Sequence, residues 1–242
     1  MSDSNSDLHY LPVSLGEAMD KLSILDIKLD KITDKRRDNV KIEYDLLFKM
    51  LEKDLEKYNL FYKIMKIINL EIWDMMNLLR DVETDEFNND YMVLCRECMI
   101  SNDVRFRIKN KINYISNCSL KEQKGYKTMR ILFDVRNNNI NIHHLIKPIK
   151  YYSFLYDEII ILTNENDNEN KSKEVLKNEF NYDPTIIITD KEEHVINLEY
   201  KKVFDLNSIN YNKETDTDIN IVELYCLLEI TNKIINNYFV NF

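Results

Sequence analysis

The residues of this sequence best suited to bind a charged ligand form a polar cluster rich in arginine and lysine. Arginine can hold a phosphate or carboxylate through two parallel hydrogen bonds, and a helix N-terminus near Asn102 would add its positive dipole end. The cluster would then be an anion-recognition face, and its alternative role is ion pairing on the solvated surface of a helical bundle. Its members are Arg80, Glu83, Arg96, Asn102, Asp103, Arg105, Arg107, Lys109 and Lys111.

Two other groups of reactive residues are weaker candidates. Cys95 and Cys98 have the C-x-x-C spacing of redox pairs and zinc sites, but no second pair completes four ligands, so we expect core thiols on a helix. His143 and His144 are adjacent, and neighbours on a helix point about 100° apart, which does not suit a shared metal ion. We predict no metal and no cofactor, and we assign no catalytic residue.

The composition limits the class of protein. The chain has 242 residues, 42 acidic against 33 basic side chains and a net charge of -9, which disfavours nucleic-acid binding. Its two glycines, Gly16 and Gly125, exclude Walker and G-x-G-x-x-G nucleotide loops. No apolar run reaches the roughly 20 residues of a membrane span, and the N-terminus lacks signal-peptide features, so we expect a cytoplasmic protein.

The elements that must position these residues begin with helices. Apolar residues recur every three or four positions, which predicts a helical bundle over residues 13–127. Ser14 and Glu17 have the capping-box spacing that begins a helix, and Ser119 and Glu122 repeat that spacing. A break with a new N-cap is predicted at Ser101, Asn102 and Asp103. The expected helices are 15–32, then one long or two abutting helices over 40–72 that return antiparallel to the first, then 88–99 and 104–115.

The second half of the sequence alternates short β-branched runs with helical stretches, which predicts a small, truncated Rossmann-like α/β domain with a mostly parallel sheet over 128–242. The fold class is therefore α+β overall, with residues 1–12 as a disordered N-terminus. A polar loop at 164–170 follows one strand, at the sheet edge where open α/β sheets bind ligands. The expected strands are 129–135, 158–163, 185–189 and 203–206, and the expected helices are 142–155, 171–180 and 218–239.

Residues 11–127 carry a series of motifs that resembles a family of small helical proteins known only as a domain of unknown function. Members are commonly encountered among bacterial and viral genes for surface-polysaccharide synthesis. The resemblance implies a glycan context and assigns no catalytic residue. In order, its motifs are 12–17 (PVSLGE), 20–29 (DKLSILDIKL), Asn39-Val40, Asn69, Glu71, Trp73, Arg80, Glu83, Asn102-Asp103, Arg105, Lys109, Ile112, Asn113 and 121–126 (KEQKGY).

Residues 146–195 are similar to the first lobe of glycosyltransferases encoded by large DNA viruses, especially at 149–152, 155–161 and 182–186. In those enzymes the first strand leads into a Gly-Asp-His type turn that contacts substrate. The matching segment here, 136–144, lacks the glycine, which departs from the family pattern. The residues after Val195 are too few for the second lobe that would hold a nucleotide sugar, because a domain takes roughly 100–150 residues.

The leading hypothesis is a viral accessory protein of glycan biosynthesis, in the host cytoplasm or virion, that binds glycan-biosynthesis enzymes or a nucleotide sugar. One alternative is a glycosyltransferase or sugar-modifying enzyme with an interdomain site, where Asp103 or Asp157 acts as base. Another is a homo-oligomerisation module that uses the amphipathic stripes from Leu15 to Ile72. The candidate ligand-binding residues are Arg80, Arg96, Asn102, Asp103, Arg105, Lys109, Lys124 and Asp157.

Overall fold

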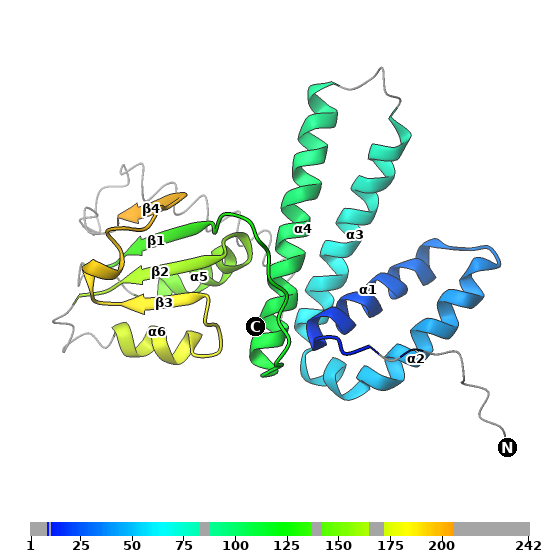
Figure 1. Cartoon of the computed structure of the whole chain (residues 1–242), viewed down its shortest axis with the longest axis horizontal. Coiled ribbons are helices and arrows are strands. Elements are labelled where there is room, and N and C mark those ends of the chain that lie inside the picture. The colour runs from blue at the N-terminus through cyan, green and yellow to red at the C-terminus, as the bar shows by residue number, and fades with distance from the viewer. Residues whose placement is uncertain (1–8, 10, 83–87, 137–141, 165–171, 206–242) are drawn as a thin grey trace. The chain divides into compact units, whose positions relative to one another are not determined.

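The computed structural model describes residues 9, 11–82, 88–136, 142–164 and 172–205 and divides the chain into two compact units. The first unit ends at Gln123, and the second begins at Lys124. The first is built of helices, and the second contains a parallel sheet with helices packed on it, so the predicted α+β fold class is confirmed (Figure 1). Of the segment predicted to be disordered, residues 1–8 and 10 lie outside the described residues.

The helical unit begins where the sequence predicts. The Ser14 Oγ accepts a hydrogen bond from the Glu17 backbone N–H at 3.2 Å, which caps the first helix. The second and third helices abut at Tyr58, as one of the two expected arrangements requires. The helices of the described part are α1 (Leu15–Lys31), α2 (Arg36–Lys57), α3 (Asn59–Asp81) and α4 (Asn89–Ile115).

The predicted break at Ser101, Asn102 and Asp103 is wrong, because α4 runs through these residues without interruption. The stretch contains no Gly or Pro, and polar residues inside a helix cost only about 0.5 kcal/mol each. The Asn102 Oδ1 accepts a hydrogen bond from Arg105 Nη1 at 3.4 Å within the same helix. The N-terminus of α4 lies instead at Asn88, whose Oδ1 accepts from the Tyr91 N–H at 3.0 Å. The expected helix dipole therefore does not act at Asn102.

The capping box predicted at Ser119 and Glu122 does not begin a helix, because residues 117–129 are irregular apart from a few turns and bends. This stretch has no apolar stripe that a helix could bury, and short helices are unstable without one. The end of α4 is closed by Asn117, which has φ 54°. The Cys118 N–H donates to the Asn113 carbonyl and the Asn117 N–H to the Tyr114 carbonyl, the pattern of a Schellman motif.

The core of the helical unit lies between α1, α3 and α4. Met19 and Leu22 of α1, Met65 of α3, and Ile108 and Ile112 of α4 are each 0% exposed. The apolar stripe of α1 is thus used inside the unit. Beyond the ends of α1 and α2, α3 and α4 continue side by side as a projecting hairpin (Figure 1).

The sheet of the second unit has the order β3-β2-β1-β4, and every pairing is parallel. Leu132 in β1 is opposite Ile160 in β2 and Val203 in β4, and Ile160 is opposite Ile187 in β3. The predicted strands are confirmed, except that Leu206 lies outside the described residues. The strands are β1 (Arg130–Asp134), β2 (Glu158–Leu162), β3 (Ile186–Thr189) and β4 (Lys202–Asp205).

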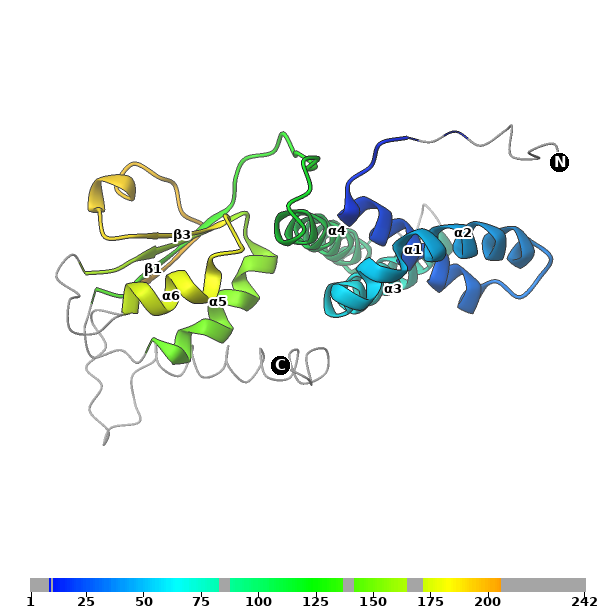
Figure 2. The same cartoon turned by 90° about the horizontal axis from the view of Figure 1, so that it is seen from below.

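The two faces of the sheet are covered differently. Helices α5 (His143–Leu155) and α6 (Ser172–Phe180) lie on one face, where they bury Phe133 of β1 (Figure 2). The connection that contains the short 3-10 turn η2 (Glu192–His194) packs on the other face. The helix predicted over 218–239 lies outside the described residues. Parallel strands of this kind bring their carboxyl ends to one edge, and we call it the carboxyl edge.

Candidate functional site

A polar network is buried where α1, α3 and α4 meet. The Asp20 carboxylate of α1 is 1% exposed. Its Oδ1 accepts from Asn69 Nδ2 and Arg105 Nε at 2.8 Å each, and its Oδ2 accepts from Arg105 Nη2 at 2.6 Å. The Asn69 amide also donates to the Ser23 Oγ at 2.8 Å. One buried carboxylate thus joins three helices, and hydrogen bonds compensate for its burial.

Lys109 forms a second part of this network. Its Nζ lies 2.9 Å from Glu17 Oε2 and 2.5 Å from Glu122 Oε2. Burial lowers the pKa of Lys109, but the hydrogen bonds that it donates to Glu122 and Glu17 outweigh this effect and leave the pKa above its ordinary value. The hydrogen bonds that Arg105 donates to Asp20 likewise raise the pKa of Arg105. Both cations therefore stay charged and are held by carboxylates of the same unit.

These pairs change the interpretation of the predicted anion-recognition face. A phosphate that bound Arg105 or Lys109 would have to displace a carboxylate that already neutralises it. Arg96 is exposed on α4, nine residues and thus roughly 13 Å before Arg105 along the helix. Arg80 is exposed in the last turn of α3. The structure thus brings Arg105 and Lys109 into one network with α1 and leaves the two exposed arginines to solvent.

The remaining candidates are spread over both units. Asn102 is exposed and Asp103 is half-buried on α4, while Glu83 lies outside the described residues. Lys124 belongs to the second unit, and its Nζ lies 5.6 Å from the Tyr126 ring centroid. The Asp157 Oδ2 accepts from the Met129 N–H at 2.8 Å. Because Asp157 directly precedes β2, it lies at the amino edge of the sheet, opposite the carboxyl edge.

At the carboxyl edge, polar side chains follow three neighbouring strands. Asp134 ends β1, Thr163 follows β2 and Thr189 ends β3, and they are 7%, 1% and 7% exposed. The Thr163 N–H and Oγ donate to the Thr189 carbonyl at 2.9 and 3.3 Å. The sheet therefore fixes a carboxylate and two hydroxyl groups at the edge where open α/β sheets bind ligands.

Arg136 links this edge to the connection on the far face of the sheet. Its Nε and Nη2 donate to the two oxygens of Asp134 at 2.9 and 2.5 Å, and its Nη1 lies 3.3 Å from Glu192 Oε1. The bidentate bond to Asp134, foremost, raises the pKa of Arg136 above its ordinary value. The guanidinium is thus a fixed donor between two carboxylates.

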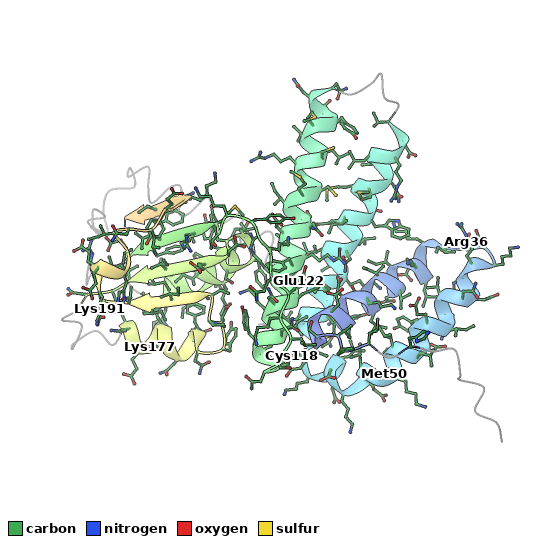
Figure 3. The ribbon with its side chains drawn as sticks, in the orientation of Figure 1. Arg36, Met50, Cys118, Glu122, Lys177 and Lys191 are labelled. Carbon is green, nitrogen blue, oxygen red and sulfur yellow. The ribbon has the colours of Figure 1, made fainter. Side chains whose placement is uncertain are left out.

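A hydroxyl and an imidazole meet at the end of β3. The Thr189 Oγ1 lies 3.3 Å from His194 Nδ1 and accepts from the Lys191 N–H at 3.1 Å. Figure 3 labels Lys191 at this end of the sheet. Lys173 of α6 bonds Asp190 and thereby lowers the pKa of that carboxyl. The edge therefore combines hydroxyl, imidazole, carboxylate and cationic groups within a short stretch after β3.

Sequence reasoning did not select Asp134, Arg136, Thr163, Thr189 or His194 as candidates. It predicted ligand binding at the carboxyl edge but assigned it to the polar loop 164–170, of which 165–170 lie outside the described residues. The usable signal is position: Thr163 and Thr189 are the last residues of two predicted strands, and Asp134 is the last but one residue of a third. A search for polar residues among the last two positions of each predicted strand would have found Asp134, Thr163 and Thr189.

In the described part of the chain, the other reactive residues do not form a cluster. No group of three or more His, Cys, Asp or Glu side chains there could hold a metal ion. Cys95 and Cys98 are half-buried free thiols on α4, and His143 is exposed at the start of α5. Among the described helices, none combines the length and apolar character that crossing a bilayer requires. Comparisons with protein-family models, curated proteins and solved structures gave no match.

Proposed function

We propose that this protein is a binding module of glycan biosynthesis whose carboxyl edge recognises the sugar part of a ligand. The single observation that carries the proposal is the set of Asp134, Thr163 and Thr189, held at the ends of three adjacent parallel strands and each more than nine-tenths buried. A carboxylate fixed by a sheet can accept hydrogen bonds from the hydroxyls of a sugar ring, and threonine hydroxyls can both donate to them and accept from them.

The charge at this edge favours a neutral sugar over a phosphate. Acidic residues outnumber basic ones there, and Arg136 is already paired with two carboxylates. A polyphosphate would meet several carboxylates with no net positive charge to offset them. The charged residues at the edge in the described part of the chain are Asp134, Asp190, Glu192, Glu193 and Asp205 against Arg136, Lys173 and Lys191.

The wider context of the proposal comes from the sequence. Both resemblances, of residues 11–127 and of 146–195, imply surface-glycan synthesis, and they support a viral accessory protein in the host cytoplasm or virion. The helical unit would then be a rigid platform for a partner enzyme, since its central cations are used to hold its own helices together. A nucleotide sugar would bind through its sugar part.

A sugar-modifying enzyme is the second candidate, and one contact favours it. A hydroxyl beside an imidazole is the arrangement in which histidine acts as a general base, and the Thr189 Oγ1 lies 3.3 Å from His194 Nδ1. In this reading Thr189 and His194 act on a sugar at the same edge. Turnover of a donor or acceptor by the purified chain would distinguish this candidate from binding alone.

The experiment is a thermal-shift and calorimetric screen of the full chain against neutral oligosaccharides, nucleotide sugars and free nucleotides. A ligand at 100 times its Kd adds about 2.7 kcal/mol to the stability of the native state. The site variant is Thr189→Val. Its matched control is Thr185→Val, the same substitution just before the amino end of the same strand. We expect a sugar-containing ligand to bind, Thr189→Val to weaken it at least tenfold, and Thr185→Val to leave the affinity within twofold.

Three outcomes would overturn the proposal. The first is no shift with any sugar-containing ligand at millimolar concentration. The second is an equal loss of affinity in Thr189→Val and Thr185→Val, since that would reflect general destabilisation. The third is equal binding of free nucleotide and nucleotide sugar, which would show that the sugar is not recognised.

A further inference from the structure

The hydroxyl proton of Thr189 is already used within the protein. The Thr189 Oγ1 accepts from the Lys191 N–H at 3.1 Å and lies 3.3 Å from His194 Nδ1. The other ring nitrogen, His194 Nε2, lies 3.9 Å from Glu193 Oε1. A ring nitrogen that faces a carboxylate keeps its proton, so Nδ1 is the acceptor of the neutral imidazole. The Thr189 hydroxyl therefore donates to His194, and only acceptance is left for a ligand.

The other two buried side chains of the carboxyl edge are acceptors as well. The Thr163 Oγ donates to the Thr189 carbonyl at 3.3 Å, so of the two roles open to this hydroxyl only acceptance remains. The Asp134 carboxylate, paired with Arg136, is ionised and has no proton to donate. Asp134, Thr163 and Thr189 therefore offer a ligand three kinds of acceptor and no donor.

The charge around these acceptors is negative. Among the described residues of the edge, acidic side chains outnumber basic ones by five to three. Arg136 and Lys173 already bind carboxylates, and the Lys191 and His194 side chains are exposed. The buried part of the edge thus suits a ligand group that donates several hydrogen bonds and carries a positive charge.

We infer that the sugar recognised at the carboxyl edge is an amino sugar, bound through its protonated amine. The inference rests on the proposed function and narrows its class of ligand. An ammonium group has three N–H donors and no acceptor, which matches the acceptors of Asp134, Thr163 and Thr189. Hydrogen bonds with an ionised partner are about twice as strong as those between neutral groups, so the amine should dominate the affinity.

Other substituents of a sugar ring suit these acceptors less well. A ring hydroxyl donates one hydrogen bond and is neutral. An acetamido group has one N–H donor, and its carbonyl oxygen would face acceptors without a donor to bind it. A simple amine shares the ammonium group but lacks the ring hydroxyls that would donate to the remaining acceptors. The edge should therefore distinguish an amino sugar from a neutral sugar, an acetylated sugar and a simple amine.

The test is calorimetry of the full chain near neutral pH with five probes. Glucosamine and 3-amino-3-deoxyglucose carry the amine at two ring positions, glucose and N-acetylglucosamine lack a free amine, and ethanolamine lacks the ring. We expect at least one amino sugar to bind about fivefold or more tightly than glucose, N-acetylglucosamine and ethanolamine. Glucose binding as tightly as both amino sugars would overturn this inference and leave the proposed function standing. Ethanolamine binding as tightly as both would also overturn it. Absence of binding by every sugar, neutral ones included, would overturn the proposed function itself.

Matched variants locate the amine. Asp134→Asn removes a charge with little change of shape and should lower the preference for amino sugar over glucose about fivefold. Asp157→Asn, the same substitution at the amino edge, should leave the preference within about twofold. If circular dichroism shows that Asp134→Asn does not fold, Thr189→Val with its control Thr185→Val takes its place, and loss of one acceptor should lower the preference about threefold. An unchanged preference in the folded site variant would overturn the inference.

Discussion

The polar residues of the two units are held over very different distances along the chain. In the helical unit, Asp20 bonds Asn69 and Arg105, which are 49 and 85 residues away, and Lys109 bonds Glu17, 92 residues away. At the carboxyl edge of the α/β unit, Asp134 bonds Arg136, two residues on, and Thr189 contacts His194, five residues on. The longer contacts at this edge, of Arg136 with Glu192 and of Thr163 with the Thr189 carbonyl, span 56 and 26 residues. The contacts of the helical unit join helices over longer separations, whereas those of Asp134 and Thr189 shape the ends of strands.

This difference indicates what each set does. Long-range polar contacts form only when the helices are packed, so their free energy stabilises the tertiary structure. Contacts between near neighbours in sequence add less to the tertiary structure. Asp20, Asn69, Arg105 and Lys109 therefore belong to a structural network of the helical unit.

The largest effect should come from Asp20→Ala. The variant leaves the Arg105 guanidinium and the Asn69 amide without their shared acceptor, and breaking a buried ion pair costs about 3–5 kcal/mol. We expect about 3 kcal/mol, because the Arg105 side chain keeps 25% exposure and can still reach water. Chemical denaturation followed by far-UV circular dichroism measures it.

The contrasting variant for Asp20→Ala is Thr189→Val in the α/β unit. It removes the hydroxyl that accepts from the Lys191 N–H, which is worth about 1 kcal/mol. A stability loss in Asp20→Ala no larger than that in Thr189→Val would contradict the inference that the polar contacts of the helical unit contribute more to tertiary stability than those of the carboxyl edge. Arg105 would then be free to bind an anion, as the sequence predicted.

The next largest effect should come from Gly16→Ala at the contact of α1 with α4. A Cβ at Gly16 would lie 2.3 Å from the carbonyl oxygen of Lys109 and within 2.9 Å of two further backbone atoms of that residue. Because backbone cannot swing aside, the helices must separate, at a cost of about 2 kcal/mol. The Gly16 N–H bond to Asn113 Oδ1, 2.8 Å long, would be strained as well.

Gly125→Ala is the matched control for this variant. A Cβ at Gly125 meets no atom within 4 Å, and replacing glycine at a compatible site stabilises a protein by about 0.4–1 kcal/mol. The two glycines of the chain should therefore respond with opposite sign in the same denaturation experiment. Equal responses would show that α1 and α4 are not in close contact at Gly16.

The sequence predicted the elements well because their signals are local. Periodicity and the Ser14 cap identified α1, and β-branched runs identified the four strands, since both depend on residues a few positions apart. The break predicted at Ser101–Asp103 does not occur, because three polar residues destabilise a helix by less free energy than the packing of α4 as a whole contributes. Tertiary packing, rather than local helix propensity, determines the structure there.

The partners of charged residues could not be predicted in the same way. Arg105 and Lys109 were identified as a cationic cluster, but nothing local indicates that Asp20, 85 residues earlier, neutralises Arg105. Glu17 was assigned to a capping box, and its carboxylate instead pairs with Lys109. The edge residues Asp134, Thr163 and Thr189 follow from topology alone, since only the parallel order of the strands brings them together.

The smallest effect should be a pH dependence of the contact between α1 and α3. Burial, and then the negative charge of Asp26, raise the pKa of Tyr62 well above its ordinary value, and its hydroxyl donates to Asp26 Oδ2 at 3.1 Å. Because the folded-state pKa is the higher one, Tyr62 contributes its full stabilisation below pH 10, and the contribution is lost as the pH rises above 10. Between pH 9 and 10.5 the free energy of unfolding of the natural chain should fall by about 0.8 kcal/mol through this group.

Tyr62→Phe should lack this part of the decline in stability, whereas Thr189→Val, which removes no titrating group, should lose stability in parallel with the natural chain. A parallel decline of Tyr62→Phe would mean that the phenol is not buried against Asp26 and that the other contacts between α1 and α3, among them the pairs of Lys66 with Asp26 and Asp30, carry the interaction.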